Sequence, residues 1–523
     1  MAAKMKYPVG IQDFAEVVER GFSYIDKTSY IRKLLDMGKY YFLSRPRRFG
    51  KSLFISTLEK YFEGKRALFK GLEIDTDDMD WTPRPVIKFS FNSIRVTEKN
   101  NIDKHLETIL SRYEVDFGVN NIVGDYSDRF ENILRTAYKK TGEKAVVLVD
   151  EYDAPIINTL EYEELNTYYR ETLKSIFTIL KNADEYIHFA FVTGVSRFSH
   201  TSLFSGANNL KDISLLPEFS AICGITEDEL KGALQPGVQD FADSLEVSYQ
   251  EMLAILKKNY DGYHFSEVSP DIYNPFSLLN ALQSRRIDNY WFESGTPTSF
   301  LKALKRDNFY LPNLECIETT SGGLSGRESF LRNPVTLLYE AGYLTIKDYD
   351  DELKAYVLSL PNEEVAVSFS EALLPIYSEY ETNECIDSLN NIRRAVIKGE
   401  PEKFMQHLQT FLAGNPYGLT ELAKRETYFE NNIYLVFRTL GFMPRSEEQT
   451  CRSRMDIMLR TRRFIYIFEL KTDGSVEEAT EQIEEKGYAL PYLDEGKTII
   501  KIAANYSSKT NNIDSWIIQE DSL

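Results

Sequence analysis

The stretch YYFLSRPRRFGKSLFISTLEKYF, residues 40–62, decides the fold of the N-terminal half. The apolar run 40–44 predicts a strand, RPRRFGKS at 45–52 a loop, and the residues from Lys51 to Phe62 an amphipathic helix. A phosphate-binding loop needs this order, because backbone N–H groups at a helix N-terminus hold an anion. We expect Lys51 to reach the β- and γ-phosphates of a nucleotide and Ser52 to bind Mg²⁺.

The loop departs from the usual phosphate-binding motif at its start, where Arg45 stands in place of a glycine. Arg45, Arg47 and Arg48 either assist phosphate binding or replace the flexibility of glycine at some cost in rate. The predicted nucleotide-binding segment consists of Arg45, Pro46, Arg47, Arg48, Phe49, Gly50, Lys51, Ser52 and Leu53.

Two further apolar runs end in polar residues. VVLVDE (146–151) ends in Asp150 and Glu151, which we expect to hold Mg²⁺ through water and to polarise the attacking water, respectively. The run 186–198 contains TGVSR, in which Thr193 is expected to sense the γ-phosphate. Arg197 either contacts developing charge as a catalytic residue or forms a structural ion pair. Because buried runs alternate with helical segments, the sequence predicts a parallel sheet of the α/β class covered on both faces.

The length, net charge and composition of the whole chain exclude several classes of protein. The chain has 523 residues, a formal net charge of −19 and no apolar run long enough to span a membrane. This charge argues against a surface coated in positive potential for nucleic acid, although not against a local basic groove. Four distant cysteines without metal-ligand spacing are expected to be reduced thiols of a cytoplasmic protein.

A second constellation lies near the C-terminus. Asp456 is followed by a strand that ends in Glu469-Leu470-Lys471, and strand alternation points Glu469 and Lys471 to one face. Two carboxylates with a lysine beside them suit Mg²⁺-dependent hydrolysis of a phosphodiester. Five arginines are expected to cluster around this metal site and contact a phosphate backbone, or else to protect a solvated hairpin edge: Arg452, Arg454, Arg460, Arg462 and Arg463.

The N-terminal motifs together resemble the AAA-ATPase-like family of bacterial proteins, which usually carry a C-terminal nuclease-like domain. They are YPVGIQDF (7–14), SYIDKTSYI (23–31), the loop region, VLVDEYDAPI (147–156), FVTGVSRFSHTSLFSGANNLKDIS (191–214), NYDGYHFS (259–266) and IYNPFSLLNAL (272–282). The resemblance implies that Arg45 is a family trait and that the sheet has the strand order of the additional-strand class. NYDGYHFS is expected to pack against the nucleotide or to contact a lid.

The C-terminal pattern is similar to that of the PD-(D/E)XK nuclease superfamily. The matched positions are Asp456, Glu469 and Lys471, and the accessory positions are Glu426 on an upstream helix and Gln482 on a downstream helix. Ser453 departs from the pattern, because relatives usually have glycine there.

The sequence therefore predicts three regions: a three-layer P-loop NTPase domain (1–225), a helical lid and winged-helix-like region (226–415), and an α/β restriction-endonuclease-like domain (416–523). Residues 337–374 predict helix, strand, turn, strand and helix. The predicted function is a Mg²⁺-dependent ATPase coupled to a nuclease fold, with ATP and Mg²⁺ as cofactors, DNA or RNA as partner, and a homo-oligomer as one possible state. The alternatives are an ATP-binding interaction switch with a silent nuclease fold, and a transcriptional regulator that uses the winged element.

Overall fold

The computed structural model describes residues 5–92, 94, 98, 100–120, 124–159, 162–197, 209–291, 301, 304–324, 334–378, 382–413, 422–441, 443–445, 456–510 and 512–521. The chain forms two compact units, each made of two segments: Met1–Tyr290 with Thr319–Val357, and Trp291–Glu318 with Leu358–Leu523.

The first unit is built on a parallel sheet with the strand order β2-β3-β4-β1-β5. The strands are β1 (Tyr40–Ser44), β2 (Val86–Ser90), β3 (Ala145–Asp150), β4 (Ile187–Gly194) and β5 (Lys211–Asp212). Strands β1 and β3 are buried along their whole length, as expected for a sheet covered on both faces. One strand, β4, lies between the strand before the loop and the strand that ends in acids, which confirms the predicted additional-strand order.

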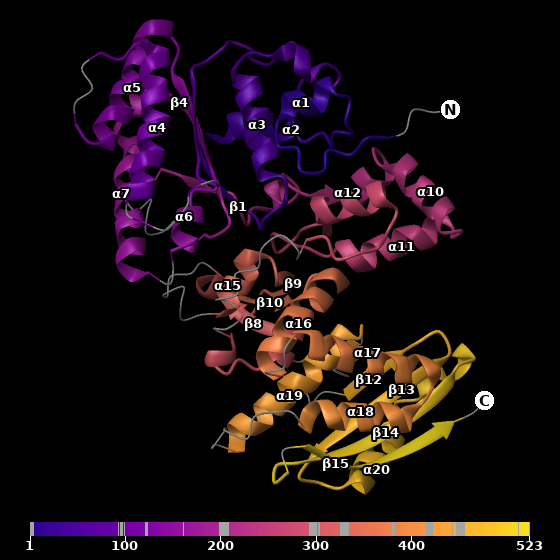
Figure 1. Ribbon diagram of the computed structural model, residues 1–523. Coiled ribbons are helices and arrows are strands. Elements are labelled where there is room, and N and C mark those ends of the chain that lie inside the picture. The colour runs from indigo at the N-terminus through magenta and orange to yellow at the C-terminus, as the bar shows by residue number, and fades with distance from the viewer. Residues whose placement is uncertain are drawn as a thin grey trace. The chain divides into compact units, whose positions relative to one another are not determined.

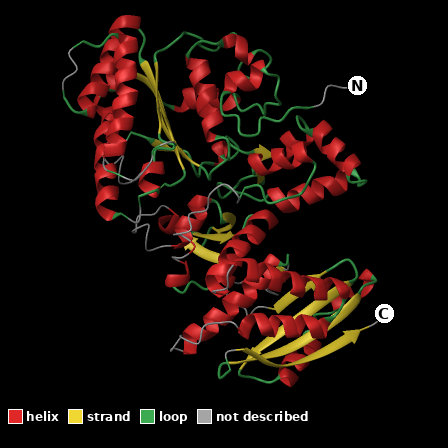
Figure 2. Ribbon diagram, in the orientation of Figure 1, coloured by secondary structure: helices red, strands yellow, loops and turns green. Residues whose placement is uncertain are grey.

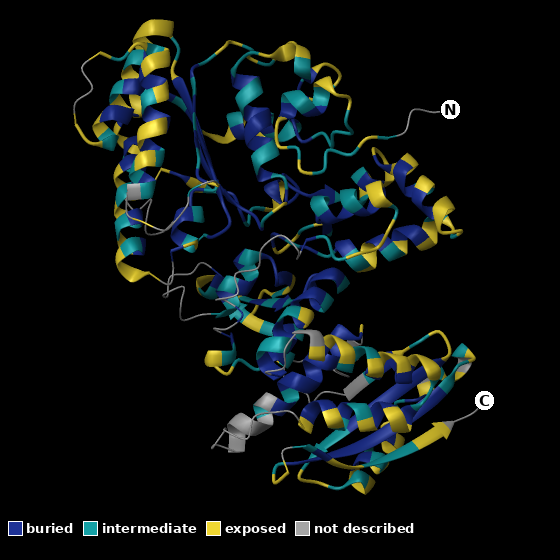
Figure 3. Cartoon of the chain, viewed as in Figure 1, coloured by how far each residue is buried: buried dark blue, intermediate teal, exposed yellow. Residues whose placement is uncertain are grey.

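Helices cover both faces of this sheet and make the predicted three layers (Figure 1). The helices α1 (Phe14–Glu19), α2 (Ser29–Met37) and α3 (Lys51–Phe62) lie on one side, and α4 (Asn100–Phe117), α5 (Tyr126–Thr141) and α7 (Glu163–Asn182) lie on the other. Between the layers the strands are buried, as Figure 3 shows in dark blue. Phe54 of α3 packs on Phe191 of β4, whereas Phe130 of α5 packs on Phe89 of β2. Short helices complete this part: η1 (Arg66–Phe69), α6 (Ala154–Ile157), η2 (Asp184–Tyr186) and η3 (Pro217–Phe219).

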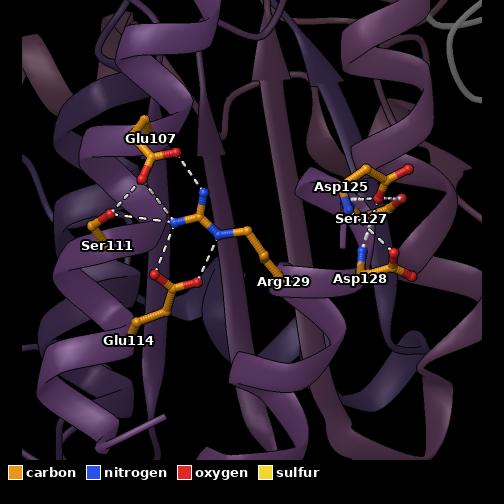
Figure 4. Close-up of polar contacts among 7 residues, drawn as sticks. All are labelled: Glu107, Ser111, Glu114, Asp125, Ser127, Asp128 and Arg129. Atoms are coloured by element: carbon orange, nitrogen blue, oxygen red, sulfur yellow. Dashed lines mark hydrogen bonds and ion pairs between the residues drawn. The ribbon is translucent and has the colours of Figure 1, made fainter. Parts of the chain in front are cut away.

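A buried ion network joins α4 to α5 (Figure 4). Arg129 of α5 donates from Nε and Nη2 to the carboxylate of Glu114, at 2.7 and 2.8 Å, and also bonds to Glu107. Only Glu107 of these three residues is substantially exposed. Helix α5 begins with a capping box, in which Asp125 and Asp128 each accept a backbone N–H of the other.

The helices predicted to form a lid follow in the same unit. This region contains β6 (Ile225–Thr226), α9 (Glu227–Lys231), α10 (Gln235–Ser244), α11 (Tyr249–Tyr260), β7 (Ile272–Tyr273) and α12 (Pro275–Ser284). The winged element has the predicted order of helix, strand, turn, strand and helix: α15 (Pro334–Ala341), β9 (Thr345–Asp350), β10 (Ala355–Ser359) and α16 (Glu363–Ser378). A third strand, β8 (Ile317–Thr320), completes the sheet β8-β10-β9. Along the chain, β8 follows η5 (Leu311–Glu315) and precedes α14 (Ser321–Leu324).

The second unit contains a five-stranded mixed sheet in the order β11-β12-β13-β14-β15. Figure 2 shows the strands of this sheet in yellow. Its strands are β11 (Met443–Arg445), β12 (Asp456–Arg460), β13 (Phe464–Thr472), β14 (Thr498–Ser507) and β15 (Asn512–Asp521). Its helices are α16, α17 (Thr382–Lys398), α18 (Pro401–Ala413), α19 (Leu422–Thr439), α20 (Val476–Glu485) and η7 (Leu490–Glu495). Strand β13 contains the predicted Glu469-Leu470-Lys471 near its end, and β15 was not predicted.

The two faces of this sheet carry different helices because the side chains of β13 alternate. Tyr466 and Phe468 pack on Phe404 of α18 and Phe437 of α19, whereas Ile465 and Ile467 form a cluster with α20. This α/β sandwich confirms the α/β class predicted for the C-terminal region.

The predictions about membrane-spanning segments and about the cysteines can be compared with the described residues. No helix among them is long and apolar enough to cross a membrane. Cys223 and Cys385 are free, as predicted, and both are buried. Cys316 is disulfide-bonded, so the prediction that all four cysteines are reduced is wrong.

Candidate nucleotide-binding and nuclease sites

The phosphate-loop segment lies at the carboxyl end of β1, where Gly50 begins α3 with a φ of 95°. Lys51 is buried, and its ammonium donates to the backbone carbonyls of Arg45 and Pro46, both at 2.9 Å. Burial lowers the pKa of Lys51, while the nearby carboxylates of Asp150 and Glu151 oppose that shift. The lysine therefore lies inside the loop, next to the acids expected to act with it.

Arg45 points away from the space enclosed by the loop. Its guanidinium is buried and donates to the carbonyls of Ser44 and Ser214, both at 2.8 Å, and of Phe219, at 2.9 Å. Its carbon Cζ also lies 4.1 Å from the ring centroid of Phe265. Through these contacts the Arg45 side chain links backbone segments inside the first unit. This argues against the interpretation that the side chain assists phosphate binding.

The other two arginines of the loop have different surroundings. Arg48 adopts a left-handed backbone, with a φ of 66°, and its guanidinium lies 3.7 Å from the ring centroid of Phe276. It thus takes a conformation that glycine ordinarily supplies, at some conformational cost. Arg47 is close enough to Glu151 to influence its pKa, so Arg47 is the loop arginine on the side of the acids.

The acids end strand β3, beside the end of β4. Asp150 is buried and accepts a hydrogen bond from the Thr193 hydroxyl at 2.8 Å. Glu151 follows with a left-handed φ of 52°, and burial raises the pKa of its carboxyl above the ordinary value. In parallel strands the carboxyl ends lie at one edge, so β1, β3 and β4 bring the loop, Asp150, Glu151 and Thr193 together.

The segment after Thr193 is held by three carboxylates. Asp153, which is fully buried, accepts the backbone N–H groups of Val195 (3.0 Å) and Ser196. Arg197 forms an ion pair with Asp212 at 2.9 Å, and its backbone N–H donates to Glu340 of α15 at 2.6 Å. The structural ion pair that the sequence left open for Arg197 is therefore present, and its catalytic role stays a prediction.

In the second unit, Glu469 and Lys471 lie on the face of β13 that α20 covers. Lys471 donates to Glu469 at 3.2 Å and to Gln482 of α20. Asp456 lies in β12, and continuation of the register Ile457↔Phe468 places it directly opposite Glu469. The side chains of Asp456 and Glu426 lie outside the described part of the chain, so their predicted roles stay predictions.

Comparisons with known proteins agree with this geometry. Residues 8–204 match the family model described as predicted AAA-ATPase, and residues 424–516 match that of the PD-(D/E)XK nuclease superfamily. An uncharacterised protein in the vnfD 5′ region of Azotobacter chroococcum mcd 1 is 33% identical over 526 residues, which cover 99% of each chain.

The chain belongs to the predicted AAA-ATPase family.

This member of the AAA-ATPase family has an ATPase-like domain and a nuclease-like domain. Within the first, the structure brings together Lys51, Asp150, Glu151 and Thr193, while Arg45 and Arg197 turn to other partners. Among the described residues, no three His, Cys, Asp or Glu side chains form a group able to hold a metal ion.

The predicted arginine cluster around the nuclease site is not supported. Arg460, Arg462 and Arg463 lie at the turn between β12 and β13, whereas Asp456 and Glu469 lie at the other end of this hairpin. Four residues of strand separate the two ends by roughly 13 Å. Arg460 is also paired with Glu495. Arg452 and Arg454 lie outside the described residues.

Sequence reasoning missed three carboxylates of this AAA-ATPase-like protein. Asp153 had a local signal, since it follows Asp150 by three residues in the stretch DEYD. Asp212 and Glu340 had none, because Glu340 meets Arg197 across 143 residues of sequence. Only the folded chain brings Asp212 of β5 and Glu340 of α15 to Arg197.

Proposed function

We propose that this protein is a Mg²⁺-dependent ATPase whose nucleotide site controls a nuclease-fold domain that acts on nucleic acid. One observation carries the ATPase part: the phosphate loop, Asp150, Glu151 and Thr193 meet at the carboxyl edge of a sheet with the order β2-β3-β4-β1-β5. Ligands of open α/β sheets bind at that edge.

The loop and its surroundings favour a nucleoside triphosphate over a bare phosphate. An apolar pocket lies against Phe49, Gly50 and Leu53, and Tyr24 and Ile222 also line it. A nucleobase would be buried there, next to the phosphate loop. Lys51 would exchange its two carbonyl partners for phosphate oxygens, which are stronger acceptors because they are charged.

The residues at the ends of β3 and β4 suit hydrolysis. Mg²⁺, held by Ser52 and by Asp150, would supply positive charge to the phosphates. Glu151 would accept a proton from the attacking water, and its raised pKa brings its basicity closer to neutral pH, where a general base works best. Thr193 fixes the orientation of the Asp150 carboxylate through its hydroxyl.

ATP turnover by wild type and Lys51→Ala, with and without nucleic acid, tests the ATPase proposal. Loss of Lys51 removes a cation from the phosphates, so turnover should fall by about 100-fold or more. Lys65→Ala is a matched control, because it removes one exposed lysine just beyond α3. Equal turnover in all three proteins would contradict the proposal.

The nuclease proposal rests on the face of β13. Glu469 and Asp456 would hold a divalent metal ion, which supplies charge at the scissile phosphate, and Lys471 would lie beside the attacking water. Gln482 keeps the Lys471 ammonium on this face. Incubation with Mg²⁺ or Mn²⁺ and DNA or RNA should give cleavage that Lys471→Ala abolishes.

The alternative function is an ATP-dependent interaction switch with a silent nuclease fold. The contacts of Lys471 also suit this alternative, because its ammonium already donates hydrogen bonds to Glu469 and Gln482. Cleavage that is equal in wild type and Lys471→Ala would favour the switch. Control of the nuclease domain by ATP would fail if ATP left its nucleic-acid affinity and its protection from proteolysis unchanged.

The winged element offers little support for a transcriptional regulator. The end of β9 and the exposed turn that follows it carry Asp348, Asp350, Asp351 and Glu352. Such a cluster repels the phosphate backbone that a DNA-binding wing must approach.

A further inference from the structure

A short segment of the lid, Tyr263–Phe265, lies between the phosphate loop and strand β9. Phe49 of the loop packs edge-on against the rings of Tyr263 and Phe265, with centroids 4.8 and 5.3 Å apart. The guanidinium of Arg45 stacks on Phe265. All four side chains are buried, so the two ends of the loop are packed against this segment.

The same segment is hydrogen-bonded to the start of the winged element. Tyr263 Oη donates to the Gly342 carbonyl at 3.2 Å. The His264 N–H donates to Thr345 Oγ1 at 2.7 Å, and that hydroxyl donates to the His264 carbonyl at 3.1 Å. Thr345 is buried, so water does not compete easily for these bonds.

A small cavity lies between the two sets of contacts. It is lined by Pro46 of the loop, by Tyr263 and Phe265, and by Leu344 and Thr345 at the start of β9. Because this cavity is small and the side chains around it are closely packed, a shift of the loop has little free space in which to dissipate.

We propose that Tyr263–Phe265, here named the relay segment, transmits the occupancy of the phosphate loop to strand β9. Occupancy must change the loop, because Lys51 has to leave the carbonyls of Arg45 and Pro46 to meet a phosphate. Arg45 and Phe49 carry that change to the relay segment, and Thr345 passes it to β9. This inference rests on the proposed binding of a nucleotide.

Amide hydrogen exchange of the full-length protein, with and without adenylyl-imidodiphosphate and Mg²⁺, tests the relay. At a ligand concentration 100 times Kd, linkage permits up to about 100-fold slower exchange where opening releases the ligand. We expect at least about tenfold slowing both in loop residues 45–53 and in β9.

The variant Tyr263→Phe with Thr345→Val removes the relay bonds and keeps every ring in place. It should retain the slowing in the loop, while the slowing in β9 falls below about twofold. Tyr263→Phe alone, which removes one bond, serves if the double variant does not fold. Lys51→Ala is the control in which the ligand should slow neither region.

Two outcomes would overturn the relay and leave nucleotide binding intact. They are slowing confined to the loop of the wild type, and slowing in β9 that persists in the variant. The second would point to the separate bond between Arg197 and Glu340. Absence of slowing in the wild-type loop would instead overturn the proposed nucleotide binding and the relay together.

Discussion

The guanidinium of Arg45 lies inside the first unit, surrounded by backbone carbonyls and by the ring of Phe265. Replacement by glycine would restore the usual motif residue but leave these carbonyls without their donors. Hydrogen bonds to charged groups contribute about 1.5–3 kcal/mol each. We expect Arg45→Gly to lower the free energy of unfolding by about 3 kcal/mol or more and not to raise ATP turnover.

Urea unfolding and turnover assays of the same preparation would check both parts. Arg48→Gly is the matched control, since Arg48 already has a glycine-like φ and is exposed. A faster Arg45→Gly enzyme of unchanged stability would show that the arginine is a substitution tolerated at a cost in rate.

Asp261, just before the relay segment, gives a pH-dependent prediction. Burial raises the pKa of this carboxyl from 3.8 to about 6, with Asp271 adding to the shift and Lys257 opposing it. Between pH 3.8 and about pH 6 the carboxyl of Asp261 keeps its proton in the folded state but has lost it in the unfolded state. Stability from this group is therefore complete below pH 3.8 and is lost as the pH rises through 6.

In the variant Asp261→Asn this side chain is an amide, which stays neutral across the whole pH range. Relative to wild type, the variant should gain stability between pH 4 and pH 8, by at most about 3 kcal/mol. Chemical denaturation of both proteins at the two pH values measures the difference. A stability difference that does not change with pH would mean that Asp261 titrates as an exposed aspartate.

At the scale of elements, the α4–α5 hairpin depends on the network around Arg129 (Figure 4). Arg129→Ala leaves the buried Glu114 carboxylate without its partner, which should cost about 3–5 kcal/mol in thermal or urea unfolding. The double change Arg129→Met with Glu114→Leu buries no charge and should cost less than half as much. Equal losses in the two variants would show that packing, rather than the ion pair, stabilises the hairpin.

The strands and the loop could be predicted from sequence because their signals are local. Buried runs such as 145–150 and the glycine before Lys51 each specify their own conformation. The direction of Arg45 could not be predicted, since its acceptors at Ser214 and Phe219 are about 170 residues away. The same reason applies to Glu340, whose partner Arg197 is 143 residues away. The distance between Glu469 and the arginines of the β12–β13 turn depends instead on the register of this hairpin.

At the scale of the molecule, the second unit includes a segment from before the winged element. Asn431 of α19 accepts the Leu311 N–H and donates to the Phe309 carbonyl, and Arg438 pairs with Glu315. Residues 416–523 alone would therefore lack these partners of α19. They would also expose the face of β13 that α17 and α18 cover.

We expect fragment 416–523 to aggregate or to lack cooperative unfolding. Residues 291–318 joined by a short glycine–serine linker to 358–523 should unfold cooperatively. Circular dichroism and light scattering of both fragments would check this. A stable monomer of 416–523 would show that the nuclease-like domain needs neither segment.

The division of the second unit between two segments also matters during synthesis. Residues 309–315 leave the ribosome before α19, which contains their partners Asn431 and Arg438. At 5–20 residues per second, roughly 6–24 s pass before that helix is made. During this interval the first unit receives its last segment, Thr319–Val357, and can finish folding. The ATPase-like part of a nascent chain is thus complete while the nuclease-like part is still unfolded.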